Sequence, residues 1–462
     1  MPSGLDPVLG ALTPVLPDAA GTADALDRAV DVAGPRTWWA GPLDVEGLLR
    51  GALQVALGAA TEVARRRGRP VRLGTTAARL AANAGSYLHL RIDGRPLVGF
   101  AASSGFFETA DGWVRLHGNY PHHAAVLDRV LGVHDRAGLI EALRDRRALE
   151  LEATIRRAGG IAGALRTPEQ WRAGAVAAAV DAQPWVAVDR YAAGPPGPAA
   201  RHLPPAADAP LGGIRVLDLT RVIAGPTASR LLALLGADVL RVDPPGLPEL
   251  LDQYLDTGAG KRSAVADLGD RDVLDRLHEL LTDADVLLTG YRPGALAAYG
   301  LDGAAVAERH PHLVHASLSA WGVSGPWAGD RGFDSIVQSC VGIAYRYGSP
   351  DGEGRWRPGQ LPVQALDVAT GYGLAAAAMA LLARRAELGG GTARLSLART
   401  AHALLDSTRP EGGAVDLEVP MAETGSSHGL LRQVRGPVLA DGVELALEAP
   451  GEYGAAALAW RS

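Results

Sequence analysis

An alternation of short apolar runs with helical stretches, from residue 212 onward, constrains the fold of this chain more than any other feature. "GIRVLDLT", "DVLRVDPP", "DVLLTGY" and "LVHASLSAWG" are predicted strands, and the first is a continuous apolar run typical of a parallel strand buried on both faces. Helical segments such as "GDRDVLDRLHELLTDA" separate them. This order predicts an α/β fold with a Rossmann-like, doubly wound parallel sheet. A long Ala-rich helix follows from Ala365 to Arg385.

A Pro-rich segment divides the chain. "AAGPPGPAARHLPPAADAPLG" contains six prolines and no hydrophobic periodicity, which is typical of a semi-rigid linker. We therefore predict four parts: an N-terminal region, this linker, the Rossmann-like domain with the long helix, and a shorter C-terminal segment. Their predicted bounds are 1–191, 192–211, 212–388 and 389–462.

Three segments occur twice in the same order. "PLDVEGLLRGALQVALG" parallels "ALDVATGYGLAAAAMAL", "RLGTTAARLAANAGS" parallels "RLSLARTAHALLDS", and "TADGWVRL" parallels "LADGVELAL". Three matches in order indicate a partial duplication. Asp44 of the first copy aligns with Asp367 of the second, but no comparable α/β unit precedes Asp44. We interpret Asp44 as a structural remnant.

Composition excludes several classes of protein. A net charge of −6 and an aromatic content of 5% argue against a nucleic-acid partner. One cysteine excludes an internal disulfide framework and a Cys-based zinc site, and we expect no metal. The apolar stretches are too short to span a bilayer, and "MPSGLDPVLG" lacks the basic start of a signal peptide. The sequence predicts a cytoplasmic protein without a membrane partner.

Two nucleotide-binding motifs are incomplete. The turn after the first strand, "TRVIAGPTASR", lacks the G-x-G-x-x-G fingerprint, which disfavours NAD or FAD and a dehydrogenase. "GAGKRS" lacks the Ser/Thr of a P-loop, which disfavours ATP hydrolysis. Arg221, Lys261, Arg262 and Arg292 nevertheless lie in loops whose strand ends converge on one crevice. They suit a ligand with several phosphates, or are ordinary surface charges. Lys261 is the single lysine among 45 basic residues.

Five segments in order between Gly212 and about Ser407 match one family. "GIRVLDLTRVIAGPTASRLLALLGADVLRVDPP", "GAGKRSAVADL", "ADVLLTGYRPGALAAYGLD", "PHLVHASLSAWGVSGPWAGDRGFD" and "VQALDVATGYGLAAAAMALLARR" carry the match. Together they resemble the family III CoA-transferases, also called the CaiB/BaiF family. The resemblance implies a Rossmann-like domain that binds coenzyme A and a smaller α+β domain beside it.

The resemblance also implies a mechanism and a substrate. Asp367 would be the nucleophile that attacks an acyl-CoA thioester, giving a mixed anhydride and then an aspartyl-CoA thioester, from which a carboxylic acid acceptor takes CoA. Coenzyme A would be a substrate, with no covalently bound cofactor. The dipole at a helix N-terminus would keep the Asp367 carboxylate ionised, although Asp at such a position alone favours a helix cap.

The resemblance assigns the CoA contacts residue by residue. Lys261, Arg262 and Arg292 would bind the CoA phosphates. Arg221 and Ala224 fall in the first-strand loop that contacts CoA. Two glycines of "WGVSGP" would let the backbone approach the thioester, or form a simple turn; they are Gly322 and Gly325.

Departures from the family pattern leave alternatives open. Phe333 stands where the racemase branch has a histidine, which disfavours an acyl-CoA racemase or epimerase. The small-domain segment "FFETADGWVRLHGNYPHH" precedes the CoA domain instead of following it, so a CoA-binding protein without turnover is another alternative. The family implies an interlocked homodimer, which one rearranged chain could mimic. His117, His122 and His123 could line a substrate pocket or bind a metal, but we favour a surface turn for them. For Cys340 we predict a buried apolar role.

Overall fold

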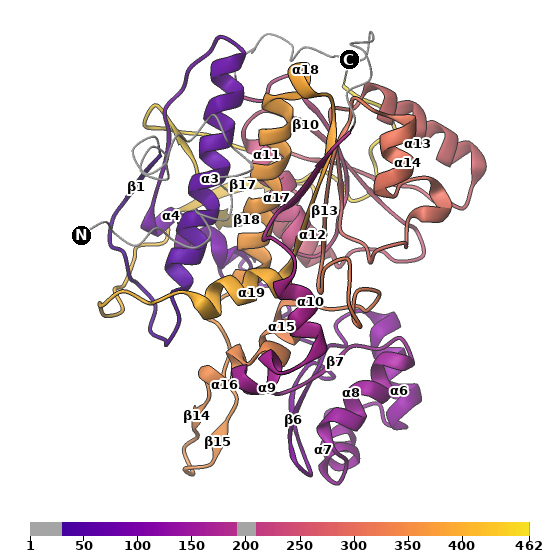
Figure 1. Cartoon of the computed structure of the whole chain (residues 1–462). Coiled ribbons are helices and arrows are strands. Elements are labelled where there is room, and N and C mark those ends of the chain that lie inside the picture. Colours follow the sequence, from indigo (N-terminus) through magenta and orange to yellow (C-terminus); the bar gives the residue numbers. More distant parts are fainter. Residues whose placement is uncertain (1–29, 192–208, 462) are drawn as a thin grey trace.

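The computed structural model describes residues 30–191 and 209–461. Its largest sheet has seven strands in the order β11, β10, β9, β12, β13, β16, β8. Strands β10 and β13 of this sheet are labelled in Figure 1. In that order their bounds are Arg262–Val265, Asp238–Asp243, Arg215–Leu219, Val286–Thr289, Val314–Ser319, Gly391–Ser396 and Ala187–Arg190. The first six strands are parallel, and β8 is antiparallel to β16.

The order of the six parallel strands confirms the predicted α/β, Rossmann-like fold. Numbered along the chain, they run 3-2-1-4-5-6, the arrangement of doubly wound dinucleotide-binding folds. The chain reverses its direction across the sheet between β9 and β12. Folds of this kind bind ligands in the crevice at the carboxyl ends of the strands beside that reversal.

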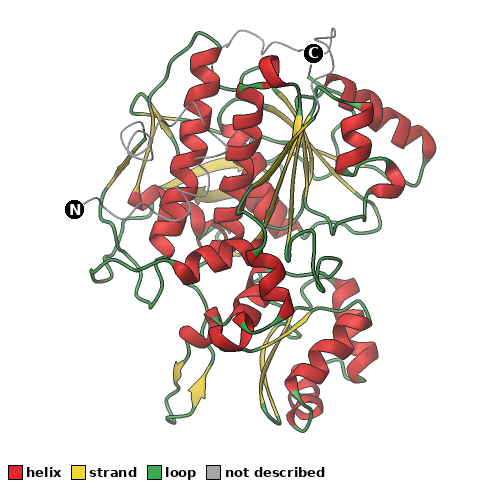
Figure 2. Cartoon of the chain, in the orientation of Figure 1, coloured by secondary structure: helices red, strands yellow, loops and turns green. Residues whose placement is uncertain are grey.

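Helices cover both faces of the sheet (Figure 2). Neighbouring strand residues face opposite cores: Val216 joins the core with α11 (Ala224–Leu234) and α17 (Ala365–Ala383), and Leu217 joins the core with α13 (Arg271–Asp283). The continuous apolar pattern of β9 follows from this burial on two sides. Asp270 begins α13 by accepting hydrogen bonds from the backbone amides of Asp272 and Val273.

The long helix α17 lies at the centre of the molecule. All its residues are buried, and it packs between α11 and α3 (Val45–Arg66). Close packing explains its small residues: a Cβ at Gly371 would lie 2.3 Å from the Ala224 carbonyl oxygen. Within the described residues α17 alone is long and apolar enough to cross a membrane, and its burial inside the protein accounts for that apolarity.

The internal repeat corresponds to a repeated structure. In the first copy α3 is followed by β2 (Leu73–Thr76) and α4 (Ala77–Ala84), and in the second α17 is followed by β16 and α19 (Leu397–Asp406). The two shorter helices are capped alike. Thr76 and Ser396 each accept a hydrogen bond from an arginine backbone amide three residues later, at 3.2 Å.

A smaller α+β unit forms the lower right of Figure 1. Its antiparallel sheet consists of β5 (Gly105–Thr109), β6 (Gly112–Leu116) and β7 (Ala162–Ala164), with β6 in the centre. Helices α6, α7 and α8 cover one face and share its core; their bounds are Pro121–Leu131, Arg136–Arg144 and Ala148–Arg157. The other face packs on α15 (Asp334–Val341).

The two ends of the chain are interleaved, which the predicted boundaries miss. A boundary at 388 separates β16 from its own sheet, and one at 191 separates β8 from it. Strands β17 (Met421–Ser426) and β18 (Gly429–Val434) join β3 and β4, while β19 and β20 join β1 and β2. Residues 192–208 of the predicted linker lie outside the described residues.

The remaining elements are short. The strands are β1 Asp31–Ala33, β3 Arg91–Ile92, β4 Arg95–Pro96, β14 Ser349–Pro350, β15 Trp356–Arg357, β19 Leu439–Ala440 and β20 Val443–Glu444. The helices are α5 Ser86–His89, α9 Pro168–Arg172, α10 Ala175–Asp181, α12 Leu251–Thr257, η2 Ala297–Tyr299, α14 Gly303–Arg309, α16 Ile343–Arg346 and α18 Arg385–Leu388.

Candidate active site

A cavity of about 300 Å³ lies at the carboxyl ends of β9, β12 and β13. The loops that follow these strands form one wall, and the first turn of α17 contributes Asp367. The start of α6, in the small α+β unit, supplies Tyr120, His122 and His123. The cavity therefore occupies the crevice that the sheet topology predicts, and two distant parts of one chain close it.

Asp367 is the third residue of α17 and is 7% exposed. Its backbone amide donates a hydrogen bond to Oδ2 of Asp334, at 3.0 Å. Burial and the negative charge of Asp334 raise the pKa of the Asp367 carboxyl well above its usual value. Desolvation and the like charge of Asp334 therefore oppose the ionisation that the dipole of α17 was expected to favour.

Asp334 is the second carboxyl of the pair and was not predicted as a site residue. It begins α15 and is 1% exposed. Burial raises its pKa to about 6, while hydrogen bonds from Gln338 and from the backbone amides of Leu366 and Asp367 oppose the rise. Asp334 is the last residue of the "GFD" segment. From the sequence, that segment was considered only for Phe333, which replaces the histidine of the racemase branch.

Three arginines line the cavity, and two of them were predicted. Arg221 donates to the Pro248 carbonyl oxygen and lies 3.8 Å from Asp243, so part of its charge is neutralised. Arg292 donates to the Gly329 carbonyl oxygen at 3.2 Å. Arg331, which was not predicted, donates to the Gly159 carbonyl oxygen at 3.0 Å. Within the described part of the chain, neither Arg292 nor Arg331 has a carboxylate oxygen within 4.0 Å.

The crevice continues beyond this cavity. A neighbouring cavity of about 180 Å³ lies along β12, β13 and β16, and Arg292 lines both cavities. Ala224 lines the main cavity, as predicted for the loop after β9. Val222 in the same loop has a φ of +70°, a strained conformation for a β-branched residue, and strain of this kind clusters at functional sites.

Lys261 and Arg262 do not reach the cavity, contrary to the prediction. Lys261 is 4% exposed; its ammonium donates to the Pro226 carbonyl oxygen at 2.9 Å and lies 3.8 Å from Asp218. Burial lowers its pKa to about 7. Arg262 points to the opposite end of the strand, where it binds Asp238 and the Ala459 carbonyl oxygen. The structure thus gives both residues partners within the protein.

Gly322 and Gly325 also lie outside the cavity. Their φ angles of +90° and +89° require glycine for a turn. A Cβ at Gly322 would lie 2.7 Å from the Gln183 side chain, and one at Gly325 would lie 2.4 Å from Ala179. The simple-turn interpretation fits this geometry.

The histidines of "LHGNYPHH" do not form a surface turn. His117 and His123 are each 5% exposed, and His117 stacks on Phe333 with ring centroids 3.8 Å apart. Burial lowers the pKa of His123 to about 3, so its imidazole is neutral. A helix start was visible in the sequence: Pro121 opens α6, and Gly132 ends it with a φ of +73°.

Cys340 and Asp44 have the structural roles that were predicted. Cys340 is fully buried, and burial raises the pKa of its thiol to about 12, which leaves it un-ionised. Asp44 caps α3 by accepting a hydrogen bond from the Gly47 amide at 2.9 Å, and Arg36 binds both its oxygens. It does not line the cavity.

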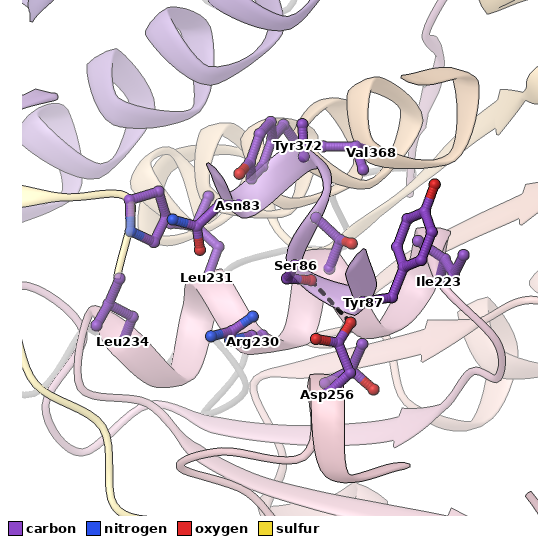
Figure 3. Close-up of a pocket in the computed structure, with 14 residues that line it drawn as sticks. Asn83, Ser86, Tyr87, Ile223, Arg230, Leu231, Leu234, Asp256, Val368 and Tyr372 are labelled. Atoms are coloured by element: carbon purple, nitrogen blue, oxygen red, sulfur yellow. Dashed lines mark hydrogen bonds between the residues drawn. The ribbon is translucent and has the colours of Figure 1, made fainter. Parts of the chain in front are cut away.

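Another, much smaller pocket lies beside the N-terminal half of α17 (Figure 3). Val368 and Tyr372 face it, and Ser86 donates a hydrogen bond across it to Asp256, at 2.8 Å. Its volume of about 30 Å³ has room for one or two water molecules. Within residues 30–191 and 209–461, no cluster of three His, Cys, Asp or Glu side chains could hold a metal ion.

The fold and this cavity define a doubly wound α/β protein with a buried carboxyl at its ligand crevice. Residues 211–432 match the sequence model of CoA-transferase family III, and this part of the chain belongs to that family. The match covers the large sheet from β9 to β16, α17 and β17, and it ends within β18. The family resemblance of the sequence is thereby confirmed.

Individual relatives carry related names. The succinate–glutarate CoA-transferase of Agrobacterium fabrum is 37% identical over 192 residues, which are 37% of this chain and 47% of that protein. An acyl-CoA transferase of Gibberella moniliformis is 31% identical over 327 residues, which are 65% of this chain and 55% of that protein. The chain thus spans about half the length of these relatives.

A solved structure completes the comparison. A CaiB/BaiF family protein from Brucella suis is 26% identical, with a TM-score of 0.38, covering 50% of this chain and 66% of that one.

Proposed function

We propose that this protein transfers coenzyme A from an acyl-CoA thioester to a carboxylic acid acceptor, with Asp367 as the nucleophile. One observation carries the proposal: the Asp367 carboxyl lines the cavity at the strand reversal, in the segment that matches the family. Its raised pKa makes the carboxylate form a stronger nucleophile once it is deprotonated.

We propose that CoA occupies the two neighbouring cavities, which share Arg292 as a lining residue. Arg292 lines both, has no carboxylate partner among the described residues, and would bind a phosphate by charge-assisted hydrogen bonds. Arg221 lines the same cavity as Asp367 and supports the same role. We leave Lys261, Arg262, Gly322 and Gly325 out of the CoA site, because their side chains or backbone contact other parts of the protein.

The proposed reaction balances in two halves. The Asp367 carboxylate attacks the thioester carbonyl. CoA leaves as a thiolate, and the acyl group remains on Asp367 as a mixed anhydride. The thiolate then attacks the Asp367 carbonyl, which releases the donor acid as a carboxylate and leaves an aspartyl-CoA thioester. In the second half the acceptor carboxylate attacks this thioester, and the released thiolate attacks the acceptor carbonyl. The new acyl-CoA departs, and Asp367 is again a free carboxylate.

A second candidate is proton transfer at the Cα of an acyl-CoA, as in a racemase or epimerase. Phe333 supplies no proton, but the neutral imidazole of His123 lines the same cavity as Asp367. A base and an acid on two walls of one cavity could exchange a Cα proton. Exchange of deuterium from solvent into the substrate, with no transfer of CoA, would favour this second function.

The rearranged domain order supports activity within one chain. Asp367 comes from α17, whereas His122 and His123 come from the small α+β unit of the same chain, and all three line one cavity. We propose that the site is complete without a partner subunit. Activity per mole of chain that stays constant upon dilution, with a monomer mass by light scattering, is the expected result.

Trapping of the covalent intermediate tests the function. The protein is incubated with a panel of acyl-CoAs, and hydroxylamine is added to convert an activated aspartyl group to its hydroxamate. Mass mapping should place the modification on Asp367, and Asp367→Asn should abolish it. Binding of CoA with no modification for any donor would favour a CoA-binding protein without turnover.

A further inference from the structure

The carboxylate of Glu249 joins three other segments of the chain beside the crevice. Glu249 lies in the loop between β10 and α12, and its side chain is fully buried. Its Oε1 accepts a hydrogen bond from the Tyr120 hydroxyl at 2.5 Å, and its Oε2 accepts one from the Val222 amide at 2.9 Å. The guanidinium of Arg241, in β10, also donates to Oε2, at 3.0 Å.

Two of these partners belong to the two parts of the chain that close the main cavity. Tyr120 lies at the start of α6 in the small α+β unit, and Val222 lies in the loop after β9 of the large sheet. Both line the cavity of about 300 Å³, whereas Glu249 does not. One carboxylate behind the cavity wall therefore holds together two lining segments that are about 100 residues apart in the sequence.

The loop that Glu249 holds is strained and carries a charge. Val222 has a φ of +70°, and such a conformation persists only where its surroundings fix it. The guanidinium of Arg221 lies 3.9 Å from Glu249 Oε1 and 5.2 Å from the centre of the Tyr120 ring. Asp243 lies 3.8 Å from the same guanidinium, so two carboxylates and one ring determine where this cavity-lining arginine stands.

This arrangement needs a carboxylate, and an amide of the same size does not replace it. Both oxygens of Glu249 accept, one from the Tyr120 hydroxyl and the other from the Val222 amide. A glutamine would present an NH₂ group in place of one oxygen, and that group cannot accept. Burial alone would raise the pKa of Glu249, but the charge of Arg241 and the hydrogen bonds lower it, so the group is ionised.

We propose that Glu249 is a positioning residue whose carboxylate fixes the small α+β unit and the loop after β9 in the relative position in which the crevice binds its ligand. It acts through Tyr120, Val222 and Arg221, which line the cavity. That the ligand is a CoA thioester rests on the proposed function, whereas the link between the two parts rests on the hydrogen bonds alone.

Hydrogen exchange tests this link without any ligand. Mass spectrometry follows the backbone amides of residues 117–125, at the start of α6, and of residues 219–226, after β9. Glu249→Gln should speed exchange roughly tenfold in both segments, since their opening no longer breaks hydrogen bonds to a charged group. Glu423→Gln, at an exposed glutamate of β17, is the matched control and should leave both segments unchanged.

A second variant keeps the test decisive if Glu249→Gln folds poorly. Tyr120→Phe removes one hydroxyl group and no charge, and should speed exchange in residues 219–226 at least about twofold. An effect of Glu249→Gln on only one segment, or no effect of Tyr120→Phe on residues 219–226, would overturn the inference. The carboxylate would then not couple the two parts of the crevice.

Binding of CoA shows whether this link serves the crevice. Titration calorimetry compares the unmodified protein with Glu249→Gln, Arg221→Gln and the double variant. Each single substitution should raise the dissociation constant about tenfold, and the double variant should raise it no more than about 20-fold, because Glu249 acts through the loop that carries Arg221. A roughly 100-fold rise, as for independent effects, would overturn the inference. Absence of CoA binding by the unmodified protein would contradict the proposed function instead, and the exchange measurement then decides this inference.

Discussion

The backbone amide of Asp367 donates a hydrogen bond to the Asp334 carboxylate, at 3.0 Å. The two carboxyls are both buried, and each disfavours the ionisation of the other. Such a pair releases its two protons in two steps, and the two apparent pKa values describe the pair as a whole rather than either residue. Both folded-state pKa values are raised, so the folded state binds these two protons more tightly than the unfolded chain does. The contribution of the protonated pair to the free energy of unfolding is therefore largest below about pH 3.8. It is lost as the pH rises through about 6 and above.

Asp334→Asn tests this coupling through the pH dependence of activity. The substitution removes the negative charge next to Asp367, so the pKa of Asp367 falls. We expect the acidic limb of the kcat/KM profile to shift to lower pH by about one unit. The measurement is the second-order rate constant of hydroxamate formation from an acyl-CoA between pH 4 and 9.

Asp272→Asn, in the exposed first turn of α13, is the control for the loss of one negative charge. It should leave the acidic limb in place. If Asp334→Asn leaves the limb unchanged as well, the charge of Asp334 does not govern the ionisation of Asp367.

Because Lys261 is paired with a buried carboxylate, we expect its substitution to destabilise the fold and to have no direct effect on CoA binding. Its ammonium lies 3.8 Å from the Asp218 carboxylate, and both side chains are fully buried. Lys261→Met leaves that carboxylate uncompensated, which should lower the free energy of unfolding by about 3 kcal/mol. Lys261→Met with Asp218→Asn should cost less than the sum of the two single substitutions, and denaturant unfolding measures all three.

The pH dependence of this loss has a definite sign. The folded-state pKa of Lys261, about 7, lies below its usual value of 10.5. The unfolded chain therefore binds this proton more tightly, and Lys261 lowers the stability as the pH falls from about 10.5 to about 7. Lys261→Met should remove that slope, and a slope that persists unchanged would show that other groups cause it.

The sequence predicted the sheet because its strands are buried on both faces, and such strands are continuous apolar runs. The convergence of the carboxyl ends of parallel strands predicted the crevice that Arg221 and Arg292 line, whatever the loops contain, whereas Asp367 came from the family resemblance. Lys261 and Arg262 follow the same logic but fail, because a charged residue beside a strand can turn into the protein. Asp218 and Asp238 lie close enough to bind them, and sequence order does not show which neighbour a side chain contacts.

His122 and His123 were expected in a surface turn rather than in the pocket, and Arg331 was not singled out, for a different reason. They enter the cavity only because the small α+β unit packs against the large sheet, and that contact joins segments about 200 residues apart. No local pattern encodes such a contact. The repeat was visible because each copy keeps its own helix–strand–helix order, but the pairing of β18 with β3 shows that the copies are interleaved.

Asp44 provides a comparison within the repeat. It aligns with Asp367, yet it caps α3 and is bound by Arg36 at 2.7 Å. Asp44→Ala should lower the free energy of unfolding by about 1–2 kcal/mol through the lost cap, and should leave hydroxamate formation at Asp367 unchanged. Thermal unfolding and the trapping assay measure the two effects. A loss of trapping with no loss of stability would contradict the structural role of Asp44.

Arg262 and Arg292 form a matched pair of guanidiniums that the sequence assigned to the same phosphates. Arg292 lines both cavities, whereas Arg262 donates to Asp238 at 2.8 Å and to the Ala459 carbonyl oxygen at 2.6 Å. Arg292→Gln should weaken CoA binding roughly 10–100-fold, the effect of losing one or two charge-assisted hydrogen bonds. Arg262→Gln should change the CoA dissociation constant less than about twofold, since its side chain has no part in the crevice.

The stability of the C-terminal segment provides a second measurement for Arg262 and Arg292. Because Arg262 holds the Ala459 carbonyl, Arg262→Gln should lower the free energy of unfolding by about 1 kcal/mol and speed proteolysis within residues 455–461. Arg292→Gln should change neither. If Arg262→Gln weakens CoA binding as much as Arg292→Gln does, the phosphates reach the far side of β11, and the crevice does not hold CoA as proposed.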